Sequence, residues 1–522
     1  MRSNGILMHL SSLPSPYGVG SMGKPAHDFV DYLVEAGQSY WQMLPICPTS
    51  YGDSPYQSFS TFAGNPYFID LEQLAADGWI EESDFKDIDW ESEEDDINYG
   101  VLYNKRYPIL RKAAKKFLSQ EEYPKSYHDF CWFNGYWLED YSLFMALKDA
   151  NDGKTWQDWD PDLRNYDPHT IWNKKQELHM EMHFWKVLQY FFFQQWYELK
   201  EYANEKGIKI IGDLPIYVSL DSVDVWAHPE LFQLDEEKKP KEVAGCPPDG
   251  FSATGQLWGN PLFDWEYMAR DGFSWWVSRI KYLTHVYDVL RIDHFRGFES
   301  YYAIPYGDPD ASGGRWRKGP GMDLWRSVEW AIGKQNIIAE DLGFLTEPVR
   351  QMLRDSGFPG MKVLEFAFDT RDANCSDYLP HSYIANCVAY VGTHDNDPVM
   401  SWMENARKED IEYAKEYLCL NDPKNYHWDM IRALIASPAD LTIVQMQDLL
   451  GLGAESRMNQ PSTVGKNWRW RAKSSDFSPE IAKKLYNYCR IYSRLPIKPE
   501  TEEDDTDEIT AEVAAEQSPE KE

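Results

Sequence analysis

At residues 291–297 the chain reads RIDHFRG, directly after the short run YDVL at residues 287–290. The run is typical of a buried strand, which places the motif at the C-terminal end of that strand. A parallel β/α barrel carries its catalytic groups at this end of its strands. Arg291 precedes Asp293 by two residues, so both side chains project from one face of the strand. The guanidinium is expected to keep Asp293 ionised and able to act as a nucleophile, although an Arg–Asp pair that only closes a barrel strand would give the same pattern.

Other strand ends also carry acids. Glu340, Asp395 and Asp213 each follow a further short apolar run. Carboxylates crowded together repel one another and add nothing to the stability of a barrel. Cleavage of a glycosidic bond with retention needs such a set, because one carboxylate attacks while one carboxylic acid protonates the leaving oxygen. The pattern therefore favours a glycoside-cleaving site built around Asp293, Glu340 and Asp395.

The apolar runs alternate with helical stretches along the whole chain, which predicts an α/β fold, a (β/α)8 TIM barrel. The eight expected strands are residues 5–8, 40–44, 208–211, 287–290, 336–339, 361–364, 387–391 and 441–445. Large, partly helical insertions separate some of them. Residues 1–498 are expected to form a single catalytic barrel with its insertions.

Three segments fall outside the barrel pattern. Residues 45–207, after the second strand, are expected to be a mostly helical insertion, with the clearest helix at Phe184 to Tyr202. Residues 214–270, after the third strand, are expected to be a second insertion, and residues 222–265 within them are interpreted as a long loop. Residues 499–522 form an acidic tail without aromatic residues, which predicts disorder.

The composition limits the possible partners. The formal net charge is −33, which argues against nucleic acid and anionic membranes. No apolar run is long enough to span a membrane, and the N-terminus enters a strand without the pattern of a signal peptide. Seven cysteines without a CxxC pair are typical of thiols in a reducing compartment. The predicted location is the cytoplasm, and the sequence carries no sign of an oligomeric state.

Metal and cofactor sites are not indicated. The strand-end acids lie on separate strands and lack the spacing of an EF-hand or a histidine cluster. Glycosyl transfer by two carboxyl groups also requires no cofactor. We therefore expect neither a metal nor a cofactor.

A set of longer motifs makes the pattern specific. They are MHLSSLPSPYGVGSMG, GDSPYQSFSTFAGNPYFIDL, GDLPIYV, GQLWGNPLFDW, RIDHFRGF, IIAEDLG, GTHDND and RMNQPSTVGKNWRWR, between residues 8 and 471. Together they resemble the 4-alpha-glucanotransferases of glycoside hydrolase family 77, in the α-amylase clan, which include amylomaltase and disproportionating enzyme. Ser462 departs from the glycine expected in the NxPGT stretch of that family.

The resemblance implies that the insertion at residues 214–270 carries a lid over the glucan groove, and it also implies roles for individual residues. Asp293 would be the nucleophile, Glu340 the general acid and then the general base, and Asp395 the stabiliser of the transition state. The residues implied in substrate binding are Ser54, Tyr56, Asp213, Gln256, Trp258, Arg291, His294 and His394. Without the resemblance, Tyr56 would be interpreted as a loop aromatic, Trp258 as a core anchor and the histidines as structural hydrogen-bonding groups.

Three functions compete. The resemblance implies a transferase that moves α-1,4-glucan segments between maltooligosaccharides or glucans such as starch and glycogen. A hydrolase of the same clan would use the same residues with water as the acceptor. A glucan-binding protein without activity is disfavoured because all three acids are present.

Overall fold

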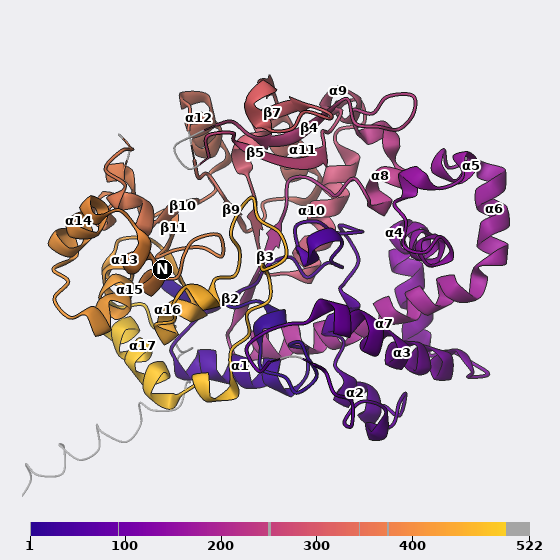
Figure 1. Ribbon diagram of the computed structural model, residues 1–522, viewed down its shortest axis with the longest axis horizontal. Helices are drawn as coiled ribbons and strands as arrows, with labels where there is room; N and C mark the ends of the chain where they lie inside the picture. The colour runs from indigo at the N-terminus through magenta and orange to yellow at the C-terminus, as the bar shows by residue number, and fades with distance from the viewer. Residues whose placement is uncertain (1, 92, 249–251, 344, 373–374, 497–522) are drawn as a thin grey trace, which may run out of the picture.

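Eight parallel strands close into a barrel (Figure 1). The computed structural model describes residues 2–91, 93–248, 252–343, 345–372 and 375–496. In order around the barrel the strands are β1 (Ser3–Leu7), β12 (Leu441–Gln445), β11 (Cys387–Tyr390), β10 (Gly360–Val363), β9 (Ile337–Ala339), β6 (Val289–Ile292), β3 (Lys209–Leu214) and β2 (Tyr40–Gln42). Each corresponds to an expected strand, so the predicted (β/α)8 barrel is confirmed.

Side chains from the strands fill the inside of the barrel. Ile211, Ile338, Met361, Val388 and Ile443 come from five different strands and form one buried cluster. Packing of this kind is expected for apolar runs that bury both faces, one against the barrel axis and one against the outer helices. The barrel is therefore a solid core, and its C-terminal rim is where polar groups can meet a substrate.

Helices surround the barrel and follow its strands. They are α1 (Lys24–Glu35) after β1, α10 (Ser274–Val286) before β6, α11 (Met322–Ile332) before β9, α12 (Glu347–Ser356) after β9, α13 (Val399–Asn405), α14 (Lys408–Leu418) and α15 (Tyr426–Ala436) after β11, and α16 (Met446–Leu450) and α17 (Pro479–Ile491) after β12. Helix α17 shows how the sequence sets such boundaries. The Ser478 hydroxyl accepts a hydrogen bond from Ile481 N, and Pro479 occupies the first helical position.

A helical group lies between β2 and β3, to the right of the barrel in Figure 1. It contains α2 (Leu71–Ala76), α3 (Tyr99–Leu118), α4 (Lys125–Ala150), α5 (Pro161–Arg164), α6 (Pro168–Glu177) and α7 (His179–Glu205). Helix α7 includes the predicted helix at residues 184–202. Buried aromatic side chains such as Trp185, Phe191 and Trp196 line it, which explains why its apolar pattern was so clear.

The segment at residues 222–265 was wrongly interpreted as a structureless loop. It contains α8 (Val223–Ala227), β4 (Glu242–Cys246) and β5 (Gln256–Pro261), and α9 (Trp265–Ala269) follows. An antiparallel sheet joins β4 and β5 to β7 (Ser300–Pro305) and β8 (Arg315–Lys318), in the order β5-β4-β7-β8. Because β4 pairs with a strand from beyond β6, its partner lies far away in the sequence and local patterns do not reveal it.

Two further predictions concern the acidic tail and membrane-spanning helices. The acidic tail at residues 499–522 lies outside the described residues. Within the described part of the chain, no helix is long and apolar enough to cross a membrane.

Candidate active site

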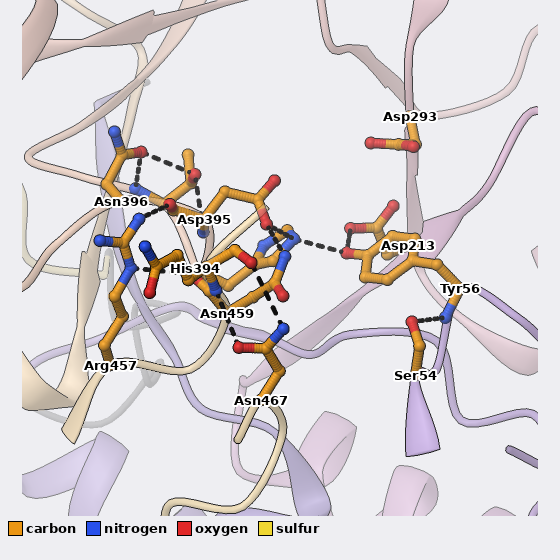
Figure 2. A network of polar contacts seen from close by, with 12 residues as sticks. Ser54, Tyr56, Asp213, Asp293, His394, Asp395, Asn396, Arg457, Asn459 and Asn467 are labelled. Carbon is orange, nitrogen blue, oxygen red and sulfur yellow. Dashed lines mark hydrogen bonds and ion pairs between the residues drawn. The ribbon is translucent and has the colours of Figure 1, made fainter. Parts of the chain in front are cut away.

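The acids singled out in the sequence lie at the C-terminal ends of the barrel strands. Asp213 is the second-last residue of strand β3, Asp293 follows β6, Glu340 follows β9, and Asp395 lies in the segment after β11. Strands β3, β6 and β9 are adjacent in the barrel. Figure 2 shows Asp213, Asp293 and Asp395 gathered around Tyr56 and His394.

Arg291 connects two of these carboxyl groups. Its Nη1 lies 2.8 and 2.7 Å from the two carboxylate oxygens of Asp213 and 3.0 Å from Asp293 Oδ1. Asp213 and Arg291 are paired across β3 and β6, so the sheet register holds this contact. The side chain of Asp213 has no exposed surface and that of Arg291 is 4% exposed. A buried arginine therefore balances the charge of a fully buried aspartate, and Asp293 is its second partner.

Asp293 differs from the sequence-based expectation in its protonation. Burial raises the pKa of Asp293, and the carboxylates of Asp213, Glu340 and Asp395 raise it further, while Arg291 lowers it. The expectation that Arg291 would hold Asp293 ionised is wrong, because burial and three like charges outweigh one shared guanidinium. The Asp293 side chain still keeps 30% of its surface exposed, so a substrate can reach it.

Glu340 lies against the residues that follow Asp293. Its Oε2 accepts a hydrogen bond from His294 N at 2.7 Å, and its Oε1 accepts one from Leu342 N, also at 2.7 Å. Backbone bonds between Phe295 N and Glu340 O and between Glu340 N and Ile292 O join the same two segments. Burial raises the pKa of Glu340, whereas Arg291 and the two backbone N–H groups lower it. A raised pKa is what a general acid needs near neutral pH.

Tyr56 closes the site from the loop after β2. Its hydroxyl donates to Asp213 Oδ2 at 2.9 Å and lies 3.0 Å from His394 Nε2. The rings of Tyr56 and His394 stack, with centroids 5.3 Å apart. Burial lowers the pKa of His394, which favours the neutral imidazole. Since Tyr56 donates to Asp213, Nε2–H of His394 is the donor to Tyr56. The Ser54 hydroxyl accepts from Tyr56 N at 3.2 Å and so supports the turn of this loop.

Trp258 reaches the site from strand β5. Its Nε1 donates to Gln256 Oε1 at 3.0 Å, and its ring meets the His294 ring edge-to-face at 4.9 Å. Burial lowers the pKa of His294 to about 3, so this imidazole is neutral. Within the described residues its Nε2 is buried without a hydrogen-bond partner. The Trp258 ring is only partly buried, so it leaves an aromatic surface at the site.

Two residues beside Asp395 were not predicted from the sequence. Asn459 Nδ2 donates to Asp395 Oδ1 at 2.6 Å, and Arg457 Nη2 donates to the Asp395 carbonyl oxygen at 2.7 Å. Both belong to the motif RMNQPSTVGKNWRWR, which was recognised as a stretch without roles for its residues. Within the described residues, no group of three or more His, Cys, Asp or Glu side chains is arranged to hold a metal ion.

Replacement of Asp213 with asparagine is expected to move the acidic limb of the pH profile of kcat/KM to lower pH. The charge of Asp213 raises the pKa of Asp293, so its removal lowers the pH at which Asp293 ionises. The maximum value should also fall, because Tyr56 loses its anionic acceptor. The measurement is kcat/KM from about pH 4 to about pH 9. As a control, Asp341→Asn removes a charge that raises the pKa of Glu340 and should instead move the alkaline limb. If the acidic limb of Asp213→Asn stays in place or moves to higher pH, ionisation of Asp293 does not set that limb.

Comparison with known proteins shows the family of this chain. Residues 8–476 match glycoside hydrolase family 77, described as 4-alpha-glucanotransferase. A 4-alpha-glucanotransferase of Clostridium butyricum is 50% identical over 489 residues, which cover 93% of this chain and 100% of that protein. This chain belongs to the 4-alpha-glucanotransferase family. The family and the enzyme class predicted from the sequence, a glycosyltransferase of the hexosyl type, are thereby confirmed.

Solved structures of family members have the same architecture. The amylomaltase from Streptococcus agalactiae, determined in complex with acarbose, is 43% identical with a TM-score of 0.92, and the match covers 95% of this chain and 100% of that one. The amylomaltase from Corynebacterium glutamicum is 18% identical with a TM-score of 0.74, over 95% of this chain and 75% of that one. The second likeness shows the fold alone.

Proposed function

We propose that this enzyme moves α-1,4-glucan segments from a maltooligosaccharide or glucan donor to the 4-hydroxyl of a glucose or glucan acceptor, by a retaining double displacement. The observation that carries the proposal is the direct contact between the Asp293 and Glu340 segments, in which His294 N donates to the Glu340 carboxylate. The carboxyl groups of Asp293 and Glu340 lie close enough to influence each other electrostatically, which suits the retaining mechanism. A neutral sugar also meets no charge penalty on an acidic protein. The predicted location remains the cytoplasm.

In the first step, a carboxylate oxygen of Asp293 attacks the anomeric carbon and the glycosidic bond breaks. Glu340 gives its proton to the departing oxygen, and the reducing-end segment leaves with a free 4-hydroxyl. In the second step, ionised Glu340 takes the proton of an acceptor 4-hydroxyl, whose oxygen attacks the anomeric carbon and releases Asp293. Asp395 stabilises the positive charge that develops on the sugar ring.

Asp293 and Glu340 both have raised pKa values, so this cycle depends on which of the two carboxyl groups carries a proton. The reaction requires one proton on the pair, placed on Glu340, with Asp293 ionised. The hydrogen bond from Arg291 to Asp293 Oδ1 favours this placement. Binding of a sugar against Tyr56, His294 and His394 would supply further donors and acceptors around the acids.

Maltotriose distinguishes transfer from hydrolysis, the second candidate. Transfer releases glucose and longer oligomers without a net gain of reducing ends, whereas hydrolysis increases the number of reducing ends. Proton NMR of the first products tests the mechanism, because double displacement leaves the new bond in the α configuration. A β-configured first product would contradict the nucleophilic role of Asp293.

Replacement of Trp258 with alanine is expected to lower transfer from maltotriose about 10-fold, equivalent to about 1.4 kcal/mol, and to raise the ratio of hydrolysis to transfer. The indole supplies stacking area beside His294 that positions a sugar acceptor, while water needs no such surface. The measurements are the product ratio and the melting temperature of one preparation. Trp316→Ala, on strand β8 of the same sheet, is the control. An earlier melting transition with an unchanged product ratio would show that Trp258 only anchors its own strand.

A further inference from the structure

The carboxylate of Asp395 is the most exposed of the three proposed catalytic acids. Its side chain is 45% exposed. Its own segment constrains it weakly, since Asp395 N lies 3.4 Å from the Thr393 hydroxyl and Asp395 Oδ1 lies 3.4 Å from His394 Nε2, both beyond the usual length of a hydrogen bond. A group that stabilises a transition state must be held within about 0.5 Å of its working position. The constraint on Asp395 therefore has to come from another part of the chain.

The constraint comes from the loop after helix α16. Asn459 Nδ2 donates to Asp395 Oδ1 at 2.6 Å, and Asn459 N donates to the carbonyl oxygen of His394 at 3.1 Å. Asn459 thus binds both the carboxylate and the preceding backbone. Figure 2 shows the two segments facing each other across these contacts.

Arg457 stabilises this arrangement through three hydrogen bonds. Its Nη2 donates to the Asp395 carbonyl oxygen at 2.7 Å, its Nε donates to the Asn459 carbonyl oxygen at 2.8 Å, and its Nη1 donates to Asp397 Oδ1 at 2.7 Å. One planar guanidinium therefore binds the backbone of Asp395 and the backbone of Asn459, the residue that donates to the Asp395 carboxylate. The side chain is 22% exposed and its charge is paired with Asp397.

We propose that Arg457 is a positioning residue for Asp395, acting through both backbones and Asn459 rather than through the substrate. This inference rests on the proposed function, in which Asp395 stabilises the transition state. In the described part of the chain, the Arg457 guanidinium bonds to two backbone oxygens and to Asp397 but not to the Asp395 carboxylate, so its effect is to fix where that carboxylate lies. Loss of the guanidinium lets Asp395 move, which weakens binding of the transition state more than binding of the ground state.

The test compares Arg457→Ala and Arg457→Lys with the unmodified enzyme on maltotriose. Arg457→Ala is expected to lower kcat about 10²-fold while KM stays within about 3-fold. Lysine should recover only part of the loss, because a single ammonium cannot reproduce a planar fork to three acceptors. Arg469→Ala is the matched control, because Arg469 lies on the same segment and pairs with Asp96, away from Asp395. Its kcat should remain close to that of the unmodified enzyme.

The effect of Arg457→Ala in the Asp395→Asn variant distinguishes loss of positioning from general damage to the loop. With an α-glucosyl fluoride donor for all variants, Arg457→Ala should lower kcat strongly in the unmodified background but cost less than about 3-fold in Asp395→Asn, because the group that it positions is already lost. Equal losses in both backgrounds, an unchanged kcat, or a rise in KM alone would overturn the proposal. If Arg457→Ala melts early, Arg457→Lys provides the same comparison. Transfer by the unmodified enzyme in the same assay tests the proposed function independently.

Discussion

Replacement of Asp293 with asparagine is expected to lower turnover of maltotriose by at least about 10⁴-fold. The amide has nearly the same shape as the carboxyl group but does not attack an anomeric carbon. Arg291 keeps its two contacts with Asp213 and so remains paired without Asp293. The measurement is the initial rate of glucose release. A rate within 10-fold of the unmodified enzyme would remove Asp293 from the nucleophilic role.

The same variant should fold at least as stably as the unmodified enzyme at neutral pH. Asp293 has a pKa that is raised in the folded protein. Such a carboxyl group contributes its full stability only below its unfolded pKa, near about 4, and the contribution is lost as pH rises through the folded pKa. Asparagine does not titrate. The melting temperature of the variant minus that of the unmodified enzyme should therefore increase as the pH rises from about 5 to about 8. A lower melting temperature at the higher pH would show that ionised Asp293 stabilises the fold through Arg291.

The barrel could be predicted because its signals are local. Each strand is a short apolar run that buries both faces, and the rim acids follow these runs directly. The boundaries of β12 agree with the expected residues 441–445, while β3 extends beyond the expected residues 208–211 to Leu214. The extension brings Asp213 into register with Arg291, a pairing that depends on which strands become neighbours.

Features that depend on distant partners were missed. Strand β4 is short, and its pairing with β7 requires a segment from beyond β6. The contact between Arg457 and the backbone of Asp395 likewise leaves no trace in periodicity. The pKa of Asp293 also escaped prediction, because the order of residues near Arg291 reveals the favourable charge but not the burial that outweighs it.

One local departure from the family pattern did have a structural meaning. Ser462 has a φ of 64°, in the left-handed region that favours glycine. The glycine expected at this position from the resemblance would adopt that conformation without the cost of about 1 kcal/mol that a side chain incurs there. The loop that carries Arg457 and Asn459 therefore contains some backbone strain in this chain.

Replacement of Glu340 with glutamine is expected to lower turnover of maltotriose by about 10²–10⁴-fold, the usual contribution of a general acid. Glutamine retains one acceptor oxygen, so one of the two N–H groups of His294 and Leu342 loses its partner. This change should lower the stability by about 1–3 kcal/mol, so the melting temperature must be measured alongside the rate. Asp341→Asn is the control, since it changes the neighbouring carboxyl group, which accepts from Met361 N, and it should retain most of the turnover at pH values below the alkaline limb that it moves.

A donor with a good leaving group separates the acid role of Glu340 from its base role. Fluoride leaves without protonation, so an α-glucosyl fluoride should glycosylate Asp293 in Glu340→Gln with a much smaller loss than maltotriose shows. The acceptor sugar then lacks a base, and the glycosyl-enzyme should accumulate as a mass increase of the intact protein. Azide needs no base, so added azide should attack the anomeric carbon, release Asp293 and give an α-glycosyl azide. Equal losses on both donors, with no mass increase and no response to azide, would show that Glu340 is neither the acid nor the base.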